Sequence, residues 1–164
     1  MKRIVLMGFM GAGKTTIGKA LAEKLSWDFI DTDAEIEKEQ GRKISEIFET
    51  EGEQAFRDME TRLLKKLEKS EERFVLSIGG GMPVRAENRE LLRQIGTVVY
   101  LKATKEELVR RLSGDASRPL LQGGALEEKV AALMAARESI YVETAHQEVV
   151  TDGKSVKELI EKIS

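Results

Sequence analysis

Residues 8–15 read Gly-Phe-Met-Gly-Ala-Gly-Lys-Thr and fill every fixed position of the phosphate-binding pattern G-x-x-x-x-G-K-[ST]. An apolar run over residues 4–7 precedes this stretch, and Ile17, Leu21 and Leu25 follow it at the spacing of one helix face. The pattern therefore lies between a predicted strand and a predicted helix, which is the context that a phosphate-binding loop requires. We interpret it as a nucleoside triphosphate site.

The chemistry of this loop assigns a task to each of its residue types. Glycines let successive backbone N–H groups point at one anion, and the helix that begins near Lys14 adds its positive dipole end. The Lys14 side chain can reach the outer phosphates, and the Thr15 hydroxyl can bind Mg²⁺. We expect the nucleotide phosphates to be bound by Gly11, Ala12, Gly13, Lys14, Thr15 and Thr16.

The composition excludes several other classes of protein. A chain of 164 residues suits one domain with a substantial core, and we expect a single domain over 1–164. There is no cysteine, so no disulfide framework or thiol nucleophile is available. The formal charge of −2 gives no general attraction to nucleic acid or membrane, and no apolar run approaches about 18 residues. We expect a cytoplasmic protein, and a monomer, without nucleic acid or membrane partners.

Strand-like and helix-like segments alternate along the chain. Near-continuous apolar strands between helices indicate an α/β fold with a parallel sheet covered on both faces. Capping boxes are predicted at Thr104 with Glu107 and at Ser155 with Glu158. The predicted strands are 4–7, 29–30, 74–78, 98–101 and 149–150, and the predicted helices are 16–25, 56–67, 126–134 and those that follow Thr104 and Ser155.

Two further groups of residues directly follow predicted strands. Gly79-Gly80-Gly81 follows one strand, and Asp31-Thr32-Asp33 follows another. Because ligands bind at the carboxyl ends of parallel strands, both groups should lie on the same edge as the phosphate loop. A triple glycine lets a ligand approach bare backbone, although a plain strand-to-helix turn is the alternative.

The two carboxylates of this edge suggest divided roles. One could hold Mg²⁺ through water, and the other could accept a hydrogen bond from a substrate hydroxyl. The structural alternative is a helix N-cap at Asp33, because Asp33 immediately precedes Ala34 and the residues that follow it.

Four arginines are candidates for binding an anionic ligand: Arg57, Arg111, Arg118 and Arg137. Arginine is suited to a bidentate grip on carboxylate or phosphate, although any single one of them could be a solvated surface charge. Glu60 lies three residues after Arg57 on a predicted helix and could orient it.

Two segments differ from the predicted core. Residues 32–61 are charged, with scattered apolar residues, and we expect them to contribute to substrate binding. Residues 112–124 carry glycines at both ends, no helical or strand period, and Arg118. Long irregular segments of compact domains are often lids, so we expect 112–124 to close over bound substrates.

Taken together, these motifs make the chain resemble the shikimate kinases over essentially its whole length. The ordered set of motifs is much more specific than the phosphate loop alone. These motifs are 8–15, Asp31-Thr32-Asp33, Phe56-Arg57-Asp58-Met59-Glu60, Gly79-Gly80-Gly81, Arg118-Pro119-Leu120-Leu121 and Ala132-Leu133-Met134-Ala135-Ala136-Arg137.

The resemblance implies a P-loop NTPase fold of the nucleoside-monophosphate-kinase type, with five parallel strands in the order 2-3-1-4-5. It implies ATP-dependent phosphorylation of shikimate to shikimate 3-phosphate in aromatic amino acid (chorismate) biosynthesis. In that family shikimate is held by Asp33, Arg57, Gly79, Gly80, Gly81, Arg118 and Arg137. Arg111, near the adenine, and Arg118 are expected to bind ATP, and Thr15 and, through water, Asp31 are expected to bind Mg²⁺. Lys14, Asp33 and Arg118 would be the catalytic residues. The loop at 151–155 lacks an expected proline, so we leave its base contacts open.

Three alternatives remain. Another small-molecule kinase of the same fold, acting on gluconate or a nucleoside monophosphate, would differ in its substrate. A GTP switch is disfavoured, because Asn88 is the only asparagine and is followed by Arg89, so no Asn-Lys-x-Asp motif exists. A non-catalytic ATP-binding regulator would consume no ATP in the presence of shikimate.

Overall fold

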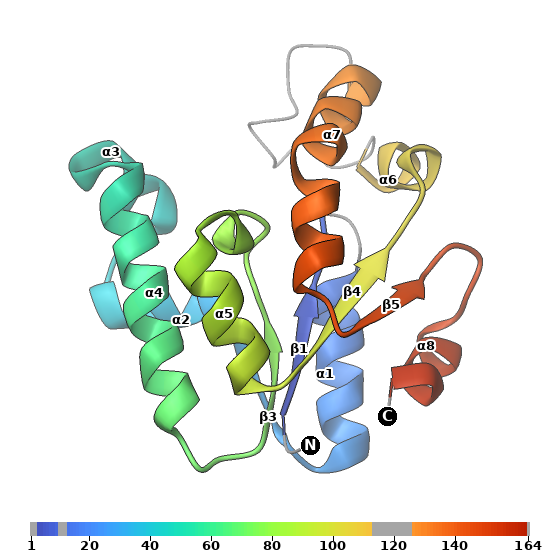
Figure 1. Ribbon diagram of the computed structural model, residues 1–164, viewed down its shortest axis with the longest axis horizontal. Helices are drawn as coiled ribbons and strands as arrows, with labels where there is room; N and C mark the ends of the chain where they lie inside the picture. Colours follow the sequence, from blue (N-terminus) through green and yellow to red (C-terminus); the bar gives the residue numbers. More distant parts are fainter. Residues whose placement is uncertain (1–2, 10–12, 113–125, 164) are drawn as a thin grey trace.

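A parallel sheet forms the centre of the computed structural model, which describes residues 3–9, 13–112 and 126–163 (Figure 1). Its order, β2-β3-β1-β4-β5, confirms the order that the resemblance implied. In the register, Val5 of β1 lies opposite Leu76 of β3 and Val98 of β4. The strands are β1 (Arg3–Met7), β2 (Asp28–Asp31), β3 (Phe74–Ser77), β4 (Thr97–Lys102) and β5 (Gln147–Val150).

Helices connect the strands, and three of these elements, α3, η1 and α5, were not predicted from the sequence, whereas α2 was considered only as the alternative interpretation of Asp33. The polar first turn of α5 hides its period, and its apolar side chains Leu91, Leu92 and Ile95 pack against the core. Segment 32–61 forms two short helices and the first half of a long one. The helices are α1 (Lys14–Leu25), α2 (Thr32–Gln40), α3 (Ile44–Glu51), α4 (Glu53–Lys69), the short 3-10 helix η1 (Met82–Val84), α5 (Ala86–Ile95), α6 (Lys105–Leu112), α7 (Leu126–Thr144) and α8 (Val156–Ile163).

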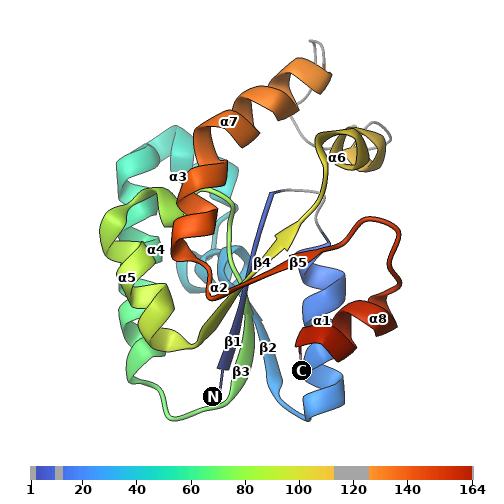
Figure 2. The same cartoon turned by 45° about the vertical axis from the view of Figure 1, so that its right-hand side comes forward.

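The core consists of one apolar layer on each face of the sheet. Along β1, Ile4 and Leu6 face the layer that includes side chains of α1 and α8, whereas Val5 and Met7 face the layer shared with α4, α5 and α7. This alternation follows from the two-residue period of a strand. Figure 2 shows α1 and α8 on one side of the sheet and α4, α5 and α7 on the other.

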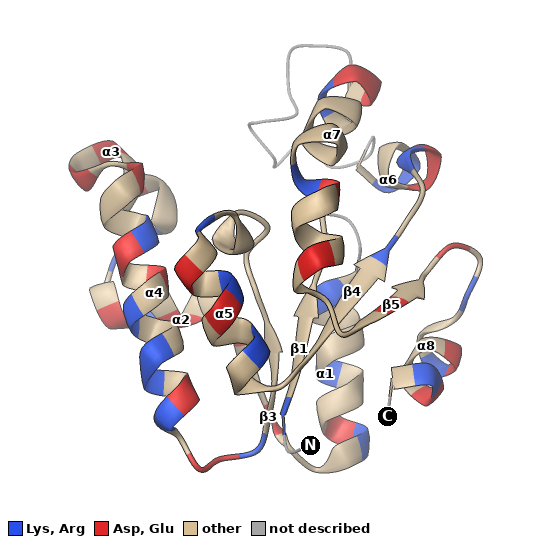
Figure 3. Cartoon of the chain, viewed as in Figure 1, with Lys and Arg blue, Asp and Glu red and all other residues tan. Residues whose placement is uncertain are grey.

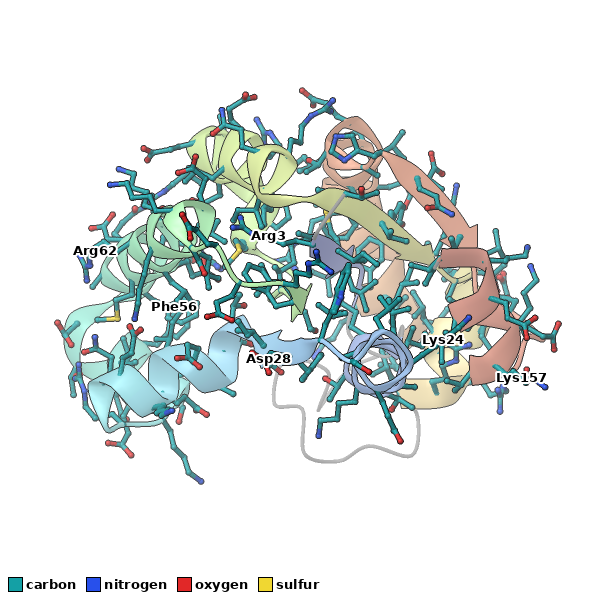
Figure 4. The ribbon with its side chains drawn as sticks, turned by 90° about the horizontal axis from the view of Figure 1, so that it is seen from below. Arg3, Lys24, Asp28, Phe56, Arg62 and Lys157 are labelled. Carbon is teal, nitrogen blue, oxygen red and sulfur yellow. The ribbon has the colours of Figure 1, made fainter. Side chains whose placement is uncertain are left out.

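The outer surface is charged and mixed in sign. Lys, Arg, Asp and Glu are spread over the helices, in keeping with a net charge of −2 (Figure 3). Seen from below, Arg62 and Lys157 lie at opposite outer edges, and Arg3 lies near the middle, where its guanidinium is 5.1 Å from the centroid of the Phe74 ring (Figure 4). Within the part of the chain that the structure describes, no helix is long and apolar enough to cross a membrane.

The two predicted capping boxes differ. At the start of α8, Glu158 N donates to Ser155 Oγ, and Ser155 N donates to Glu158 Oε1, both at 3.2 Å, which confirms that box. At α6, Glu107 N donates to Thr104 Oγ1, but Thr104 N donates to Asp152 rather than to Glu107. The reciprocal half of this box was therefore predicted wrongly, because the Glu107 carboxylate instead pairs with Arg110 and Arg111.

Candidate active site

One cleft of about 610 Å³ lies at the carboxyl ends of the strands and brings the separate sequence candidates together. A cavity of this size is typical of small-molecule sites. Its walls include Gly13, Lys14, Thr15 and Thr16 of the phosphate loop and the start of α1, together with Asp31, Asp33, Arg57, Gly79, Gly80, Gly81 and Arg137. Apolar side chains from α3, α4, α6 and α7 complete the lining: Ile44, Phe48, Phe56, Leu108, Leu112, Val130 and Leu133. We call Asp33, Arg57, Arg137 and Gly79–Gly81 the charged wall.

The described part of the phosphate loop has the backbone that its glycines were expected to permit. Gly13 has a φ of +87°, a left-handed conformation that side chains other than glycine adopt at a cost. The Lys14 ammonium donates to the Gly8 carbonyl at 2.7 Å and to the Phe9 carbonyl at 3.2 Å. These bonds hold the lysine across the start of the loop, beside the exposed residues Thr15 and Thr16.

The cap of α2 is formed by Asp31 and not by Asp33. Asp31 Oδ1 accepts from the N–H groups of Asp33 at 3.0 Å and Ala34 at 3.4 Å. The alternative interpretation of Asp33 as the N-cap is therefore wrong, because Asp33 already lies within the first helical turn. The Asp33 carboxylate is left to line the cleft.

Asp33 lies against the first glycine of the triple. Thr32 is fully buried, and its Oγ1 accepts from Gly79 N at 3.2 Å, which ties the start of α2 to the end of β3. A Cβ on Gly79 would be 3.0 Å from Asp33 Oδ1. Burial raises the pKa of Asp33 above its ordinary 3.8, Asp31 acts in the same direction, and Lys14 opposes them.

Arg57 is oriented by a buried glutamate, as its spacing suggested. Arg57 Nη1 lies 2.7 Å from Glu60 Oε1, and the Glu60 side chain is 1% exposed. Desolvation by burial raises the pKa of Glu60 to about 7, although the hydrogen bond from Arg57 and its charge pull it down. Glu60 therefore orients Arg57 through this hydrogen bond, while burial opposes ionisation of its carboxyl group.

Arg137 and Tyr141 share one face of α7 and both reach the second glycine. The Tyr141 hydroxyl donates to the Gly80 carbonyl at 2.5 Å, and its ring contacts Phe9 of the phosphate loop edge-on at 4.8 Å. Tyr141 was not a sequence candidate, yet its position four residues after Arg137 was a signal that the two side chains meet. Tyr141 connects the charged wall to the phosphate loop.

Each glycine of the triple faces one functional side chain. A Cβ on Gly79 would meet Asp33, one on Gly80 would be 3.2 Å from Arg137 Nη1, and one on Gly81 would be 2.4 Å from Arg57 Nη2. The alternative of a plain strand-to-helix turn does not account for three such contacts. The triple glycine makes space for a carboxylate and two guanidinium groups against the backbone.

The remaining candidates lie apart from this wall or outside the described residues. Arg111 is held by Glu107 Oε1 at 2.9 Å and lies 3.4 Å from Thr151 Oγ1, beside the loop at 151–155 whose contacts were left open. Its adenine role stays a prediction. Gly11, Ala12, Arg118 and residues 113–124 of the expected lid lie outside the described residues.

The donors in the cleft are of the type that Mg²⁺ prefers. Thr15 supplies a hydroxyl and Asp31 a carboxylate, and both line the cleft. Residues 3–9, 13–112 and 126–163 contain no group of three or more histidine, cysteine, aspartate or glutamate side chains arranged for a metal ion. Two oxygen donors without a full protein cage fit an ion that keeps its waters and binds substrate phosphates.

Comparison with known proteins gives a consistent result. The shikimate kinase family model matches residues 10–164. The shikimate kinase of Pelotomaculum thermopropionicum is 44% identical over 163 residues, covering 99% of this chain and 94% of the relative. That of Geobacter sulfurreducens is 45% identical, covering 99% of this chain and 89% of the relative. The solved structure of shikimate kinase from Acinetobacter baumannii in complex with shikimate superposes with a TM-score of 0.90 at 44% identity, covering 99% of this chain and 90% of that one. Motif order, sheet topology and these matches agree, and the chain belongs to the shikimate kinase family.

Proposed function

We propose that this chain transfers the γ-phosphoryl group of ATP to the 3-hydroxyl of shikimate, giving shikimate 3-phosphate and ADP for aromatic amino acid biosynthesis. The observation that carries the proposal is the charged wall, which lines the same cleft as the phosphate loop. Two guanidinium groups suit the carboxylate of shikimate, and a carboxylate suits its hydroxyls. The comparisons support shikimate over the alternative acceptors, gluconate and nucleoside monophosphates.

Arg57 and Arg137 bind and orient the substrate carboxylate in this proposal. Both line the cleft, and the glycine beside each leaves space for its guanidinium. Glu60 holds Arg57 on one side at 2.7 Å. Fixing a rigid ring at its carboxylate places its hydroxyls reproducibly, which lowers the entropic cost of reaching an in-line geometry.

Asp33 accepts a hydrogen bond from the 3-hydroxyl and holds its proton as the reaction proceeds. A bond forms between the hydroxyl oxygen and the γ-phosphorus, and the bond from that phosphorus to its bridging oxygen breaks. The raised pKa of Asp33 makes it a better proton acceptor than an ordinary aspartate. In a loose transition state the proton leaves late, so Asp33 acts mainly through orientation.

Lys14 stabilises the charge that develops on the transferring group. Its position at the start of α1 adds a fixed positive charge to the helix dipole. Thr15 and, through water, Asp31 would hold Mg²⁺, which when bound neutralises charge on the phosphates. The sequence assigns Arg118 the same stabilising task, and that role stays a prediction. We also propose that the enzyme works as a cytoplasmic monomer.

A coupled ADP-release assay with shikimate, quinate, gluconate and AMP side by side tests the proposal. ADP release should depend on shikimate and exceed that with any other acceptor. An Arg137→Ala variant, which keeps the phosphate loop, should lose the preference for shikimate. Faster release with gluconate or AMP would support the other kinases of this fold, and no acceptor-dependent release would support a regulator.

A further inference from the structure

Asn88 and Arg89 at the start of α5 have no part in the site described so far. Asn88, which belongs to no guanine-binding motif, is polar and fully buried. Buried amides are costly unless they are hydrogen-bonded. Both residues bind η1, which directly continues the triple glycine.

Together the two residues hold three consecutive carbonyl groups of η1. Asn88 Nδ2 donates to Met82 O at 3.1 Å, and Arg89 Nη1 donates to Pro83 O at 2.9 Å and Val84 O at 3.1 Å. The other end of the Asn88 amide lies 2.7 Å from Thr61 Oγ1 on α4. Asn88 is therefore a bridge between η1 and the helix that carries Arg57. Figure 1 shows α4 and α5 side by side.

The donors and acceptors around Asn88 determine which end of its amide faces each partner. Met82 O can only accept, so the NH₂ end of Asn88 must face it, and Oδ1 must face Thr61. Thr61 has one hydroxyl hydrogen, which is donated to Asn88 Oδ1 at 2.7 Å in preference to Arg57 O at 3.1 Å. The Thr61 oxygen in turn accepts from Arg85 Nη1 at 3.1 Å.

The bridge spans the place where the charged wall is tightest. Thr61 lies one turn after Arg57, and Met82 directly follows Gly81, whose Cβ position is 2.4 Å from Arg57 Nη2. The separation of α4 and η1 therefore sets how the Arg57 guanidinium lies against the glycine backbone. We propose that Asn88 and Thr61 are positioning residues that hold Arg57 in register with Gly81 for the substrate carboxylate. This inference rests on the proposed function.

Kinetics of Asn88→Ala, Thr61→Val and Thr61→Ser, with Thr144→Val as a matched control, test the proposal. Thr144 is also a buried helical threonine, but its hydroxyl donates to Ile140 O of its own helix, at 2.7 Å. Asn88→Ala and Thr61→Val should each raise KM for shikimate about tenfold and change KM for ATP by less than about twofold, from the loss of one buried hydrogen bond with its alignment. Thr61→Ser keeps the hydroxyl and should stay close to the wild type.

The double variant adds a second criterion. Because both residues belong to one bridge, Asn88→Ala with Thr61→Val should raise KM for shikimate little more than either change alone. Thr144→Val should lower Tm without a selective effect on shikimate. If Asn88→Ala fails to fold, the contrast between Thr61→Val and Thr61→Ser decides the question.

Several outcomes would overturn the inference. Equal rises in KM for both substrates, or a shikimate effect of Thr144→Val as large as that of Thr61→Val, would show a general loss of stability. Unchanged KM values in folded variants would show that the bridge does not position Arg57. In each case a wild type that releases ADP with shikimate leaves the proposed function intact, whereas an inactive wild type would contradict the proposed function itself.

Discussion

The two sides of the cleft are built in different ways. The phosphate side comes from one stretch of chain, in which backbone geometry and a helix start do most of the work. The charged wall combines α2, the β3–η1 connection, α4 and α7, and places side chains against glycines. If the proposed function holds, the contrast teaches that a continuous motif encodes the site for ATP, the common co-substrate, whereas long-range packing encodes the site for shikimate, the specific one.

The largest effect should come from the phosphate side. Lys14→Ala removes a charge aimed at the transferring group and should raise the barrier by about 4 kcal/mol, seen as a fall in kcat. Circular dichroism should remain native, since Lys14 is only partly buried and donates to the carbonyl groups of Gly8 and Phe9 rather than to the core. Near-normal turnover would show that Lys14 of the phosphate loop takes no part in the mechanism, and the charged wall would then have the larger effect.

A second effect should come from Glu60, the buried acid beside Arg57 of the charged wall, and should appear in the pH dependence of stability. Because the pKa of Glu60 is raised from 4.5 to about 7, the folded chain binds more protons than the unfolded chain within that window. The free energy of unfolding should therefore fall by about 3 kcal/mol as pH rises from 4.5 through 7. Glu60→Gln should flatten this decline in urea denaturation at pH 5 and pH 8.

Other groups do not obscure that measurement. The pKa of Asp33 is also raised, so Asp33 lowers the free energy of unfolding with rising pH in both the wild type and Glu60→Gln. The pKa of Glu107 is lowered to about 2, so Glu107 titrates below this pH window. Glu53→Gln, at an exposed glutamate at the start of the same helix, is the matched control. An equal pH dependence in Glu60→Gln and wild type would mean that the glutamate carries its charge throughout.

A third, smaller effect should be selective for one substrate. Arg137→Ala removes a charge-assisted contact to the shikimate carboxylate and should cost about 2 kcal/mol in kcat/KM for shikimate. The Kd for ATP should change little, because the Arg137 guanidinium lies against Gly80 of the β3–η1 connection and the variant keeps Lys14, Thr15 and Thr16. Comparable weakening of ATP binding and of shikimate binding would show that Arg137 does not act on shikimate alone.

The smallest effect should come from a single methyl group. In Gly81→Ala the new Cβ would lie 2.4 Å from Arg57 Nη2, and the guanidinium must move. Gly81 has a φ of −91°, so alanine meets no backbone strain there, and any change reports the displaced arginine. We expect KM for shikimate to rise about tenfold, which corresponds to a loss of about 1.4 kcal/mol of binding free energy. Gly80→Ala, with its nearest contact at 3.2 Å, should cost less, and the reverse ranking would contradict the assignment.

The sequence predicted what is local or periodic. The strand–loop–helix of residues 4–25 and all the strands followed from apolar runs, and the strand order came from the family resemblance. The helix α5 was missed because Ala86, Glu87, Asn88 and Arg89 open it with no apolar period. The identity of the capping residue also escaped prediction. Asp31 and Asp33 are both suitable N-caps by residue type, and only the position at which the backbone becomes helical shows that Asp31 is the cap.

The wall itself was predictable as a set of residues but not as an arrangement. Arg57 with Glu60 followed from helix spacing, yet the burial of Glu60, and with it the raised pKa, depends on the packing of α4 among its neighbours α2, α3 and α5. The roles of the three glycines depend on side chains that are 24 to 57 residues away in the chain, and no local pattern carries that information.

The pairing of each glycine with one charged side chain constrains how the enzyme can diverge. An arginine or aspartate replaced by a smaller residue leaves a void beside the glycine, and a glycine replaced by a larger one collides with its partner. Neither change alone yields a well-formed site for a different acid. A lineage that acquires a new acceptor must therefore alter both members of a pair, so single mutational steps along that route pass through poorly active intermediates.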